Sequence, residues 1–157
     1  MILADIRFCA KTDLERILKV ERTSPHPWSE RVITRDLVIG DTGLSYIGAF
    51  APAAQDKLLG YAVLGDEKGN GLLMNLVVLP EHQRCGFGTQ LVVAAAECAS
   101  DMGFFSLVLR VRVSNVAALT LYRNLGFKAD ATRESFYSDG DVAQYMSAKL
   151  PLTIKIE

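Results

Sequence analysis

A strand that runs directly into a glycine turn and a helix is the feature that most constrains this sequence. Residues 71–80 read GLLMNLVVLP, and Pro80 ends the strand because it cannot donate a ladder hydrogen bond. QRCGFG follows at 83–88, and the next residues carry the apolar spacing of a helix that closes at Gly103. Backbone N–H groups at such a helix start bind anions. The sequence therefore predicts a strand–turn–helix unit that can hold a phosphate.

The turn matches neither of two familiar phosphate loops. A P-loop needs Lys followed by Ser or Thr, and no such pair follows Gly86 or Gly88. A dinucleotide loop needs a third glycine where Leu91 stands. What remains is a run of backbone N–H groups that a pyrophosphate can approach, with Arg84 adding positive charge. Taken alone, a turn of this kind is more often a plain connection into a helix.

Hydrophobic periodicity and turn residues predict the other elements. Strands are expected at 3–9, 44–51, 57–65, 105–112, 127–136 and 141–149. The first helix is expected to follow Thr12 or Asp13 as N-cap and to end near Ser24, and the second to follow Ser29 as N-cap and to end near Val38. A helix from about Val116 to Leu125 is expected to be capped by Asn115 and closed by Gly126. This order predicts a mixed α/β sheet, with a parallel pair where the helix after the glycine turn joins strands 71–80 and 105–112. A ligand is expected at the carboxyl ends of that pair.

Length and charge narrow the class of protein. The chain has 157 residues, half of them hydrophobic, which suits one domain over residues 1–150 with 151–157 as a tail or an edge strand. Its 18 acidic and 17 basic residues nearly cancel, which argues against a nucleic-acid surface or a basic membrane anchor. Three cysteines without a CxxC pair and two histidines predict no metal site. Without a signal-like start or a long apolar span, we expect a cytoplasmic protein.

Two longer motifs give the turn a context. The turn belongs to VLPEHQRCGFG, residues 78–88, and a second strand–helix unit carries SNVAALTLYRNLGF, residues 114–127. On these motifs the chain resembles the GNAT superfamily of acyl-CoA-dependent N-acyltransferases over nearly its whole length. With PWSE at 27–30, Asn75 and FYSDG at 136–140, it most resembles the RimI-like branch, which acetylates the first amine of a ribosomal protein. The resemblance implies a mostly antiparallel sheet of six or seven strands, splayed between the fourth and fifth, with about four helices.

The resemblance also implies acetyl-CoA as the donor and assigns residues to it. The pyrophosphate would be held by the backbone of Arg84, Cys85, Gly86, Phe87, Gly88 and Thr89, and the pantetheine arm by Leu76, Val77 and Val78. Asn115 would contact the cofactor, and Tyr122 would be the general acid toward the thiolate. These two residues are seven apart, about two helical turns, so both side chains point along one helix face. Cys85 is expected to be an inert spacer rather than a reactive thiol.

Arg110 departs from the pattern of that branch, where a glutamate usually serves as general base. A guanidinium stays protonated and cannot replace it. A protein α-amine with a pKa near ~8 costs only ~1.4 kcal/mol to deprotonate at neutral pH, against roughly 4.6 kcal/mol for a lysine. We therefore expect a weakly basic acceptor amine, deprotonated through ordered water at Asn75 or at a backbone carbonyl of the strand 71–80.

The acceptor side of the site is predicted from three residues. Arg110 is expected either to select an acidic acceptor or to form an ion pair with a carboxylate on a neighbouring strand. Trp28 and Tyr137 are expected to line the acceptor site, with core packing as the alternative for Trp28.

Three functions fit these residues. The first is acetyl transfer to a protein N-terminus through a ternary complex, with a ribosomal protein as the acceptor that the resemblance suggests. The second is the same enzyme class acting on a small-molecule amine or amino acid. The third is a non-catalytic acyl-CoA-binding module, which the intact Tyr122 disfavours. A monomer or a dimer is compatible with the sequence.

Overall fold

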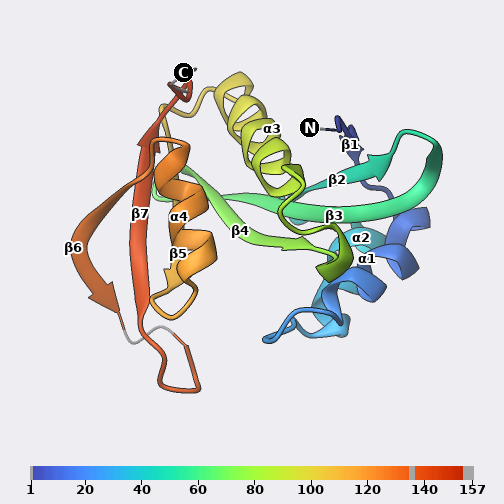
Figure 1. Ribbon diagram of the computed structural model, residues 1–157, viewed down its shortest axis with the longest axis horizontal. Helices are drawn as coiled ribbons and strands as arrows, with labels where there is room; N and C mark the ends of the chain where they lie inside the picture. Colours follow the sequence, from blue (N-terminus) through green and yellow to red (C-terminus); the bar gives the residue numbers. More distant parts are fainter. Residues whose placement is uncertain (1, 135–136, 154–157) are drawn as a thin grey trace. The chain divides into compact units, whose positions relative to one another are not determined.

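The computed structural model describes residues 2–134 and 137–153. Within these residues the helices are α1 (Leu14–Glu21), α2 (Glu30–Ile39), α3 (Phe87–Asp101) and α4 (Val116–Asn124), with short 3₁₀ turns at Lys11–Asp13 and Pro80–His82. The strands are β1 (Asp5–Phe8), β2 (Ser45–Ala51), β3 (Ala54–Glu67), β4 (Asn70–Val78), β5 (Ser106–Arg112), β6 (Lys128–Glu134) and β7 (Ala143–Lys149). Figure 1 shows their course through the chain.

The strands form one mixed sheet of seven in the described residues, in the order β1-β2-β3-β4-β5-β7-β6. β1–β2, β2–β3, β5–β7 and β6–β7 pair antiparallel. β4 and β5 pair in parallel over Gly71–Leu73 and Leu107–Leu109, while β4 itself continues to Val78. The predicted GNAT-type sheet, with its parallel pair and splay at the fourth and fifth strands, is confirmed.

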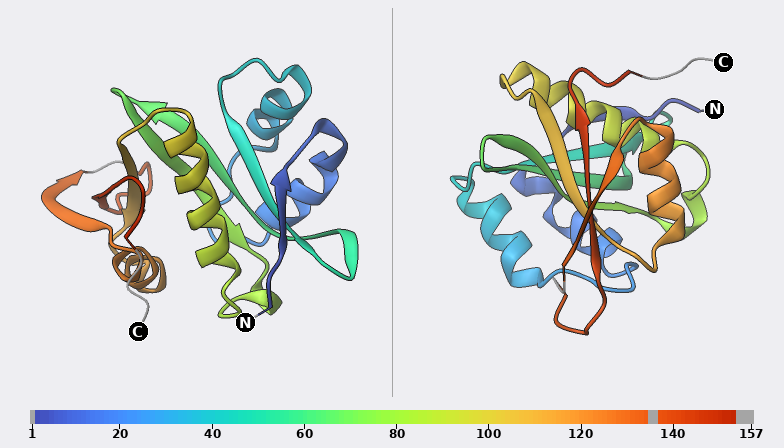
Figure 2. Two further views of the ribbon diagram at one scale, coloured as in Figure 1. Left: turned by 90° about the horizontal axis from the view of Figure 1, so that it is seen from above. Right: turned by 90° about the vertical axis from the view of Figure 1, so that its left-hand side faces the viewer.

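The chain forms two compact units. The first comprises Met1–Gly65 and Asn75–Ala95, and the second comprises Asp66–Met74 and Ala96–Glu157. In the first unit, α1 and α2 lie on one side of β2 and β3, and the first turns of α3 lie on the other (Figures 1 and 2). The helix pair meets the strands in a buried core that includes Ile17, Ile33, Phe50, Tyr61 and Val77.

The second unit is built on β5, which is buried at Leu107, Val108 and Leu109. β7 pairs with β5 along its whole length, and β6 pairs with the other side of β7. α4 lies against these strands (Figure 2) and turns at Gly126, whose φ of 94° is left-handed, into the buried Phe127. This is the C-terminal glycine cap that the sequence predicts.

The expected elements are present, but some of their ends differ from the prediction. The turn expected across residues 51–56 is tighter, because β3 already begins at Ala54 and pairs there with Ala51. Residues 151–153 form no strand, and 154–157 lie outside the described residues. β6 ends at Glu134, whereas the last two residues of the strand expected to reach 136 also lie outside them.

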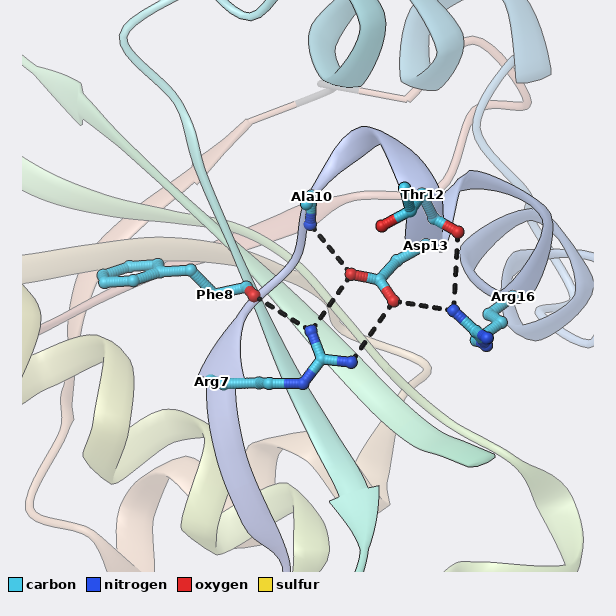
Figure 3. Close-up of polar contacts among 6 residues, drawn as sticks. All are labelled: Arg7, Phe8, Ala10, Thr12, Asp13 and Arg16. Atoms are coloured by element: carbon cyan, nitrogen blue, oxygen red, sulfur yellow. Dashed lines mark hydrogen bonds and ion pairs between the residues drawn. The ribbon is translucent and has the colours of Figure 1, made fainter. Parts of the chain in front are cut away.

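Asp13 joins β1 to the start of α1, but not by the side-chain cap that we expected. Its carboxylate is buried and accepts hydrogen bonds from the Ala10 N–H at 2.8 Å, Arg16 at 3.0 Å and both Arg7 terminal nitrogens at 3.2 and 3.4 Å (Figure 3). The Arg7 guanidinium also lies 3.6 Å from the centre of the Phe50 ring. One buried carboxylate therefore fixes an edge strand, a loop and a helix together.

This arrangement predicts an acid-sensitive contribution to stability. Burial acts to raise the pKa of Asp13, but the Ala10 N–H and the two arginines outweigh it, so that the pKa lies below its usual range. A carboxyl with a depressed folded-state pKa stabilises the fold fully above its unfolded pKa, about 3.9, and loses this contribution as the pH falls through the lower folded value. Because the Arg7 and Arg16 side chains are 45% and 39% exposed, solvent screens their ion pairs, and the partly buried hydrogen bond from Ala10 lowers the pKa most.

Asp13→Asn is therefore expected to lower the free energy of unfolding by about 1–3 kcal/mol at pH 7. Urea unfolding of both proteins at pH 7 and pH 3 measures the difference, which should narrow at the lower pH. A difference that is the same at both pH values would show that the charge of Asp13 has no part in it.

Candidate active site

The glycine turn has the backbone conformation of an anion-binding loop. Arg84 and Gly86 both take left-handed φ angles, 62° and 88°, and α3 begins at the next residue, Phe87. The first N–H groups of a helix have no intrahelical partner, and turns with left-handed residues direct successive N–H groups into one concavity. Arg84 and Cys85 are exposed, whereas Phe87 is buried as the anchor of the helix. The loop can accept a phosphate at its backbone, with the Arg84 charge beside it.

β4 presents Asn75 and the peptide groups that were predicted to bind pantetheine. The Asn75 amide oxygen accepts the N–H of Leu76 at 3.1 Å, and the Val78 carbonyl accepts a hydrogen bond from the Gln83 side chain at 3.1 Å. Val77 is buried and packs into the core of the first unit. Side chains thus already contact two of the backbone groups in this predicted subsite.

A buried carboxylate that was not among the predicted site residues lies beneath Asn75. Glu21, at the end of α1, is 2% exposed and accepts hydrogen bonds from Tyr61 Oη at 2.5 Å, Asn75 Nδ2 at 2.8 Å and the Trp28 N–H at 2.7 Å. Burial, and next the hydrogen bond to Glu21, raise the pKa of Tyr61, so its phenol keeps the proton that it donates. The available signal was a charged residue on the apolar face of a helix, in register with Leu14, Ile17 and Leu18.

Trp28 is half-buried and packs against the core of the first unit, as its alternative role predicts. Its place in an acceptor site stays a prediction.

Tyr122 and Asn115 lie on α4 at the predicted spacing. Asn115 caps the helix by accepting the Ala118 N–H at 3.1 Å, as expected. Tyr122 is 7% exposed, and its ring meets that of Phe127 edge to face at 5.6 Å. Burial, and to a lesser degree the Tyr137 phenol, raise the pKa of Tyr122, which keeps its phenol protonated. A protonated buried phenol is a suitable donor to a leaving thiolate.

Arg110 forms a two-fold ion pair. Its Nη1 and Nη2 each lie 2.7 Å from a carboxylate oxygen of Glu67 on β3, and the side chains are 18% and 25% exposed. The guanidinium also lies 5.6 Å from the centre of the Tyr145 ring. Its hydrogen bonds lower the pKa of Glu67, against a smaller opposing effect of burial. Of the two roles predicted for Arg110, the structure contains an ion pair, but its partner is on β3, which β4 separates from β5 in the sheet, rather than on a neighbouring strand. Selection of an acidic acceptor stays a prediction.

The pair is expected to couple the two side chains by about 1–3 kcal/mol, between the values typical of exposed and of buried pairs. The measurement is a double-mutant cycle of unfolding free energies with Arg110→Gln, Glu67→Gln and the double variant. A coupling near zero would contradict it.

The proposed selection of an acidic acceptor has a separate test. It predicts that Arg110→Glu weakens the preference for acidic over neutral acceptors, and an unchanged preference would contradict it.

Tyr137 lies in the β6–β7 connection of the second unit. Its ring centre is 3.9 Å from the Arg112 guanidinium, and Arg112 Nη1 also pairs with Asp139 at 2.8 Å and Asp141 at 3.3 Å. Ser114 Oγ donates to the same Asp141 carboxylate at 2.8 Å. These contacts attach the connection to the end of β5. Whether Tyr137 lines an acceptor site remains a prediction from the sequence.

The predicted residues fall into both units. Trp28, Asn75, residues 76–78 and the loop 84–89 belong to the first unit, and Arg110, Asn115, Tyr122 and Tyr137 belong to the second. Among the described residues, no cluster of His, Cys, Asp and Glu is suited to a metal ion, and no helix is long and apolar enough to cross a membrane.

The strand order, with its parallel pair at β4 and β5, and the glycine turn before α3 fit the fold that the sequence resemblance implies, and the comparisons with known proteins agree. Residues 11–127 match the acetyltransferase (GNAT) family, and the chain belongs to it. It is an N-acetyltransferase, as are its curated relatives. It is 31% identical over 133 residues to the ribosomal protein bS18-alanine N-acetyltransferase of Salmonella typhimurium, covering 84% of this chain and 86% of the relative. It is 29% identical to an N-alpha-acetyltransferase of Sulfurisphaera tokodaii, with 92% of each chain covered.

Solved structures give the same picture. The crystal structure of the ribosomal-protein-S18-alanine N-acetyltransferase from Escherichia coli superposes with a TM-score of 0.80 at 25% identity, over 99% of both chains. The PaiA N-acetyltransferase from Thermoplasma acidophilum, solved in complex with coenzyme A, shares the fold with a TM-score of 0.74 at 23% identity over 94% of this chain and 99% of its own.

Proposed function

We propose that this enzyme transfers the acetyl group of acetyl-CoA to the α-amine of a protein N-terminus. The observation that carries the acceptor class is the Arg110–Glu67 pair. Arg110 cannot accept a proton, and Glu67, with a lowered pKa, is a weak base. An amine that is already partly neutral at physiological pH suits such a site, and an N-terminal α-amine has the required pKa. The relatives named as N-terminal acetyltransferases support the same class.

The donor assignment rests on the loop at residues 84–89. Its left-handed residues and the opening turn of α3 offer backbone N–H groups to a pyrophosphate, and Arg84 supplies a cation. When bound, acetyl-CoA supplies an activated thioester carbonyl for attack by the amine. We assign Leu76, Val77, Val78 and Asn115 to the same cofactor from the family resemblance.

Tyr122 acts on the sulfur. Because its raised pKa exceeds that of a thiol, the phenol stabilises the departing thiolate chiefly by donating a hydrogen bond, rather than by losing its proton outright. In the net reaction a C–N bond forms, the C–S bond breaks, and one proton of the amine ends on the thiol of coenzyme A. Asn75 orients the water that first accepts this proton.

The test follows thiol release from acetyl-CoA with a panel of acceptors. The panel contains an alanine-first peptide, the same peptide blocked at its N-terminus, free amino acids and small polyamines. We expect turnover with the free N-terminus and none with the blocked peptide. Faster turnover of a small amine would replace the proposed acceptor, and binding of acetyl-CoA without turnover of any amine would favour a non-catalytic binding module.

A further inference from the structure

Two buried carboxylates in the first unit make the same contact with a tyrosine. Glu21 is 2% exposed and accepts from Tyr61 Oη at 2.5 Å, and Asp36 on α2 is 5% exposed and accepts from Tyr46 Oη at 2.7 Å. The two tyrosine rings stack on each other, with centroids 5.9 Å apart and planes 9° from parallel. Both carboxylates therefore fix a helix to the same pair of rings.

Their remaining contacts separate the two carboxylates. Glu21 Oε2 accepts a hydrogen bond from the backbone N–H of Trp28. Glu21 Oε1 accepts hydrogen bonds from the Asn75 side-chain amide and from Tyr61 Oη. Asp36 is contacted by its chain neighbour Arg35 at 3.5 Å. Only Glu21 thus joins the α1–α2 connection to β4, among the contacts of these two carboxylates in the described residues.

Simple packing does not require a charge at this place. Burying a carboxylate is costly unless donors surround it, and an apolar side chain of similar volume fills a core as well or better. What the carboxylate adds is direction, since three donors from three separate segments must converge on two oxygen atoms. Trp28 follows SPHP, a Pro-containing connection without a helix or strand of its own. The hydrogen bond from its backbone N–H to Glu21 therefore fixes the backbone position from which the indole extends.

We propose that Glu21 is a positioning residue for the acceptor. It holds Trp28 and Asn75 in one fixed arrangement, and so sets the affinity for the acceptor amine without contacting it. This rests on the proposed function, which assigns both residues to the acceptor side. The two oxygens of Glu21 are occupied and buried, so it acts through these residues and not as the base.

The test compares Glu21→Gln with Asp36→Asn as the matched control. A glutamine keeps an oxygen for Tyr61 and Asn75 but turns an NH₂ group toward the Trp28 N–H, so that contact is lost. An asparagine at 36 likewise keeps an oxygen for Tyr46. We expect both variants to lose stability, whereas only Glu21→Gln raises the KM for the acceptor peptide, by about tenfold, with the KM for acetyl-CoA within about twofold of the wild type.

Trp28 supplies a readout that needs no turnover, because it is the single tryptophan of the chain. In the unliganded protein, Glu21→Gln is expected to shift its fluorescence to longer wavelength and to speed hydrogen exchange of its backbone amide, whereas Asp36→Asn leaves both unchanged. Titration of a tryptophan-free, alanine-first peptide into the protein with coenzyme A should need about tenfold more peptide in Glu21→Gln. If that variant does not fold, Tyr61→Phe keeps the carboxylate, removes one donor, and should give about threefold effects.

The proposal is overturned if Glu21→Gln and Asp36→Asn change acceptor KM and Trp28 emission alike, or if Glu21→Gln changes neither. Failure of the proposed function looks different. In that case the wild type turns over no α-amine peptide, while the emission and exchange of Trp28 still report its positioning, and acceptor KM is compared with whichever amine the wild type uses.

Discussion

Tyr122→Phe is expected to lower kcat by about two to three orders of magnitude, the usual cost of removing one hydrogen-bond donor to a charge that develops in the transition state. The phenol is buried on α4, and the environment that raises its pKa keeps the proton in place for the leaving sulfur. A phenylalanine fills the same volume and keeps the edge-to-face contact with Phe127, so the fold should persist. Steady-state thiol release with saturating acetyl-CoA and acceptor measures the change.

Tyr46→Phe is the matched control for this prediction. It removes the hydroxyl group of another buried tyrosine, which donates to Asp36 at 2.7 Å and has no part in the proposed reaction. We expect it to reduce the free energy of unfolding by about 1–3 kcal/mol and to leave kcat within a factor of about two. If Tyr122→Phe lowers activity no more than Tyr46→Phe does, Tyr122 is a packing residue.

Selectivity between amines is the second large effect. At pH 7 the free energy needed to neutralise an α-amine and a lysine ε-amine differs by about 3 kcal/mol, or roughly 200-fold in the neutral fraction. An enzyme without a strong base inherits this difference, because it can use only the amine that is already neutral. We expect kcat/KM at pH 7 to favour a free N-terminus over a lysine of an N-terminally blocked peptide by about that factor.

The pH dependence distinguishes ionisation from recognition. At pH 9 the α-amine is almost fully neutral, whereas the neutral fraction of the lysine has risen about a hundredfold from pH 7. The ratio of the two kcat/KM values should therefore fall by about tenfold. The measurement uses two peptides of the same amino-acid sequence. One has a free N-terminus and an acetylated lysine, and the other has an acetylated N-terminus and a free lysine. Equal rates at pH 7 would show that this enzyme has a base that its Arg110–Glu67 pair does not reveal.

Local pattern was sufficient for the elements and for the loop. Three of these signals act over only a few residues: the proline after β4, the glycine turn before α3 and the asparagine that caps α4. They could therefore be predicted from the local sequence. The turn predicted between β2 and β3 was too long because Ala54–Asp56 lack a strong strand preference, whereas Ala54 pairs with Ala51 of β2 in the structure. The side-chain cap expected at Asp13 was replaced by contacts to Arg7 and the Ala10 N–H.

The side-chain partnerships were decided only when distant segments came together. Arg110 could be placed on a strand face and known to lack basicity, but its partner Glu67 stands 43 residues away. Glu21 could be seen on the apolar face of α1, yet Tyr61 and Asn75 are 40 and 54 residues further along. Periodicity assigns a residue to a face because backbone geometry repeats over a few residues. It does not choose which side chain from another strand meets that face, because this depends on sheet register and packing across the whole core.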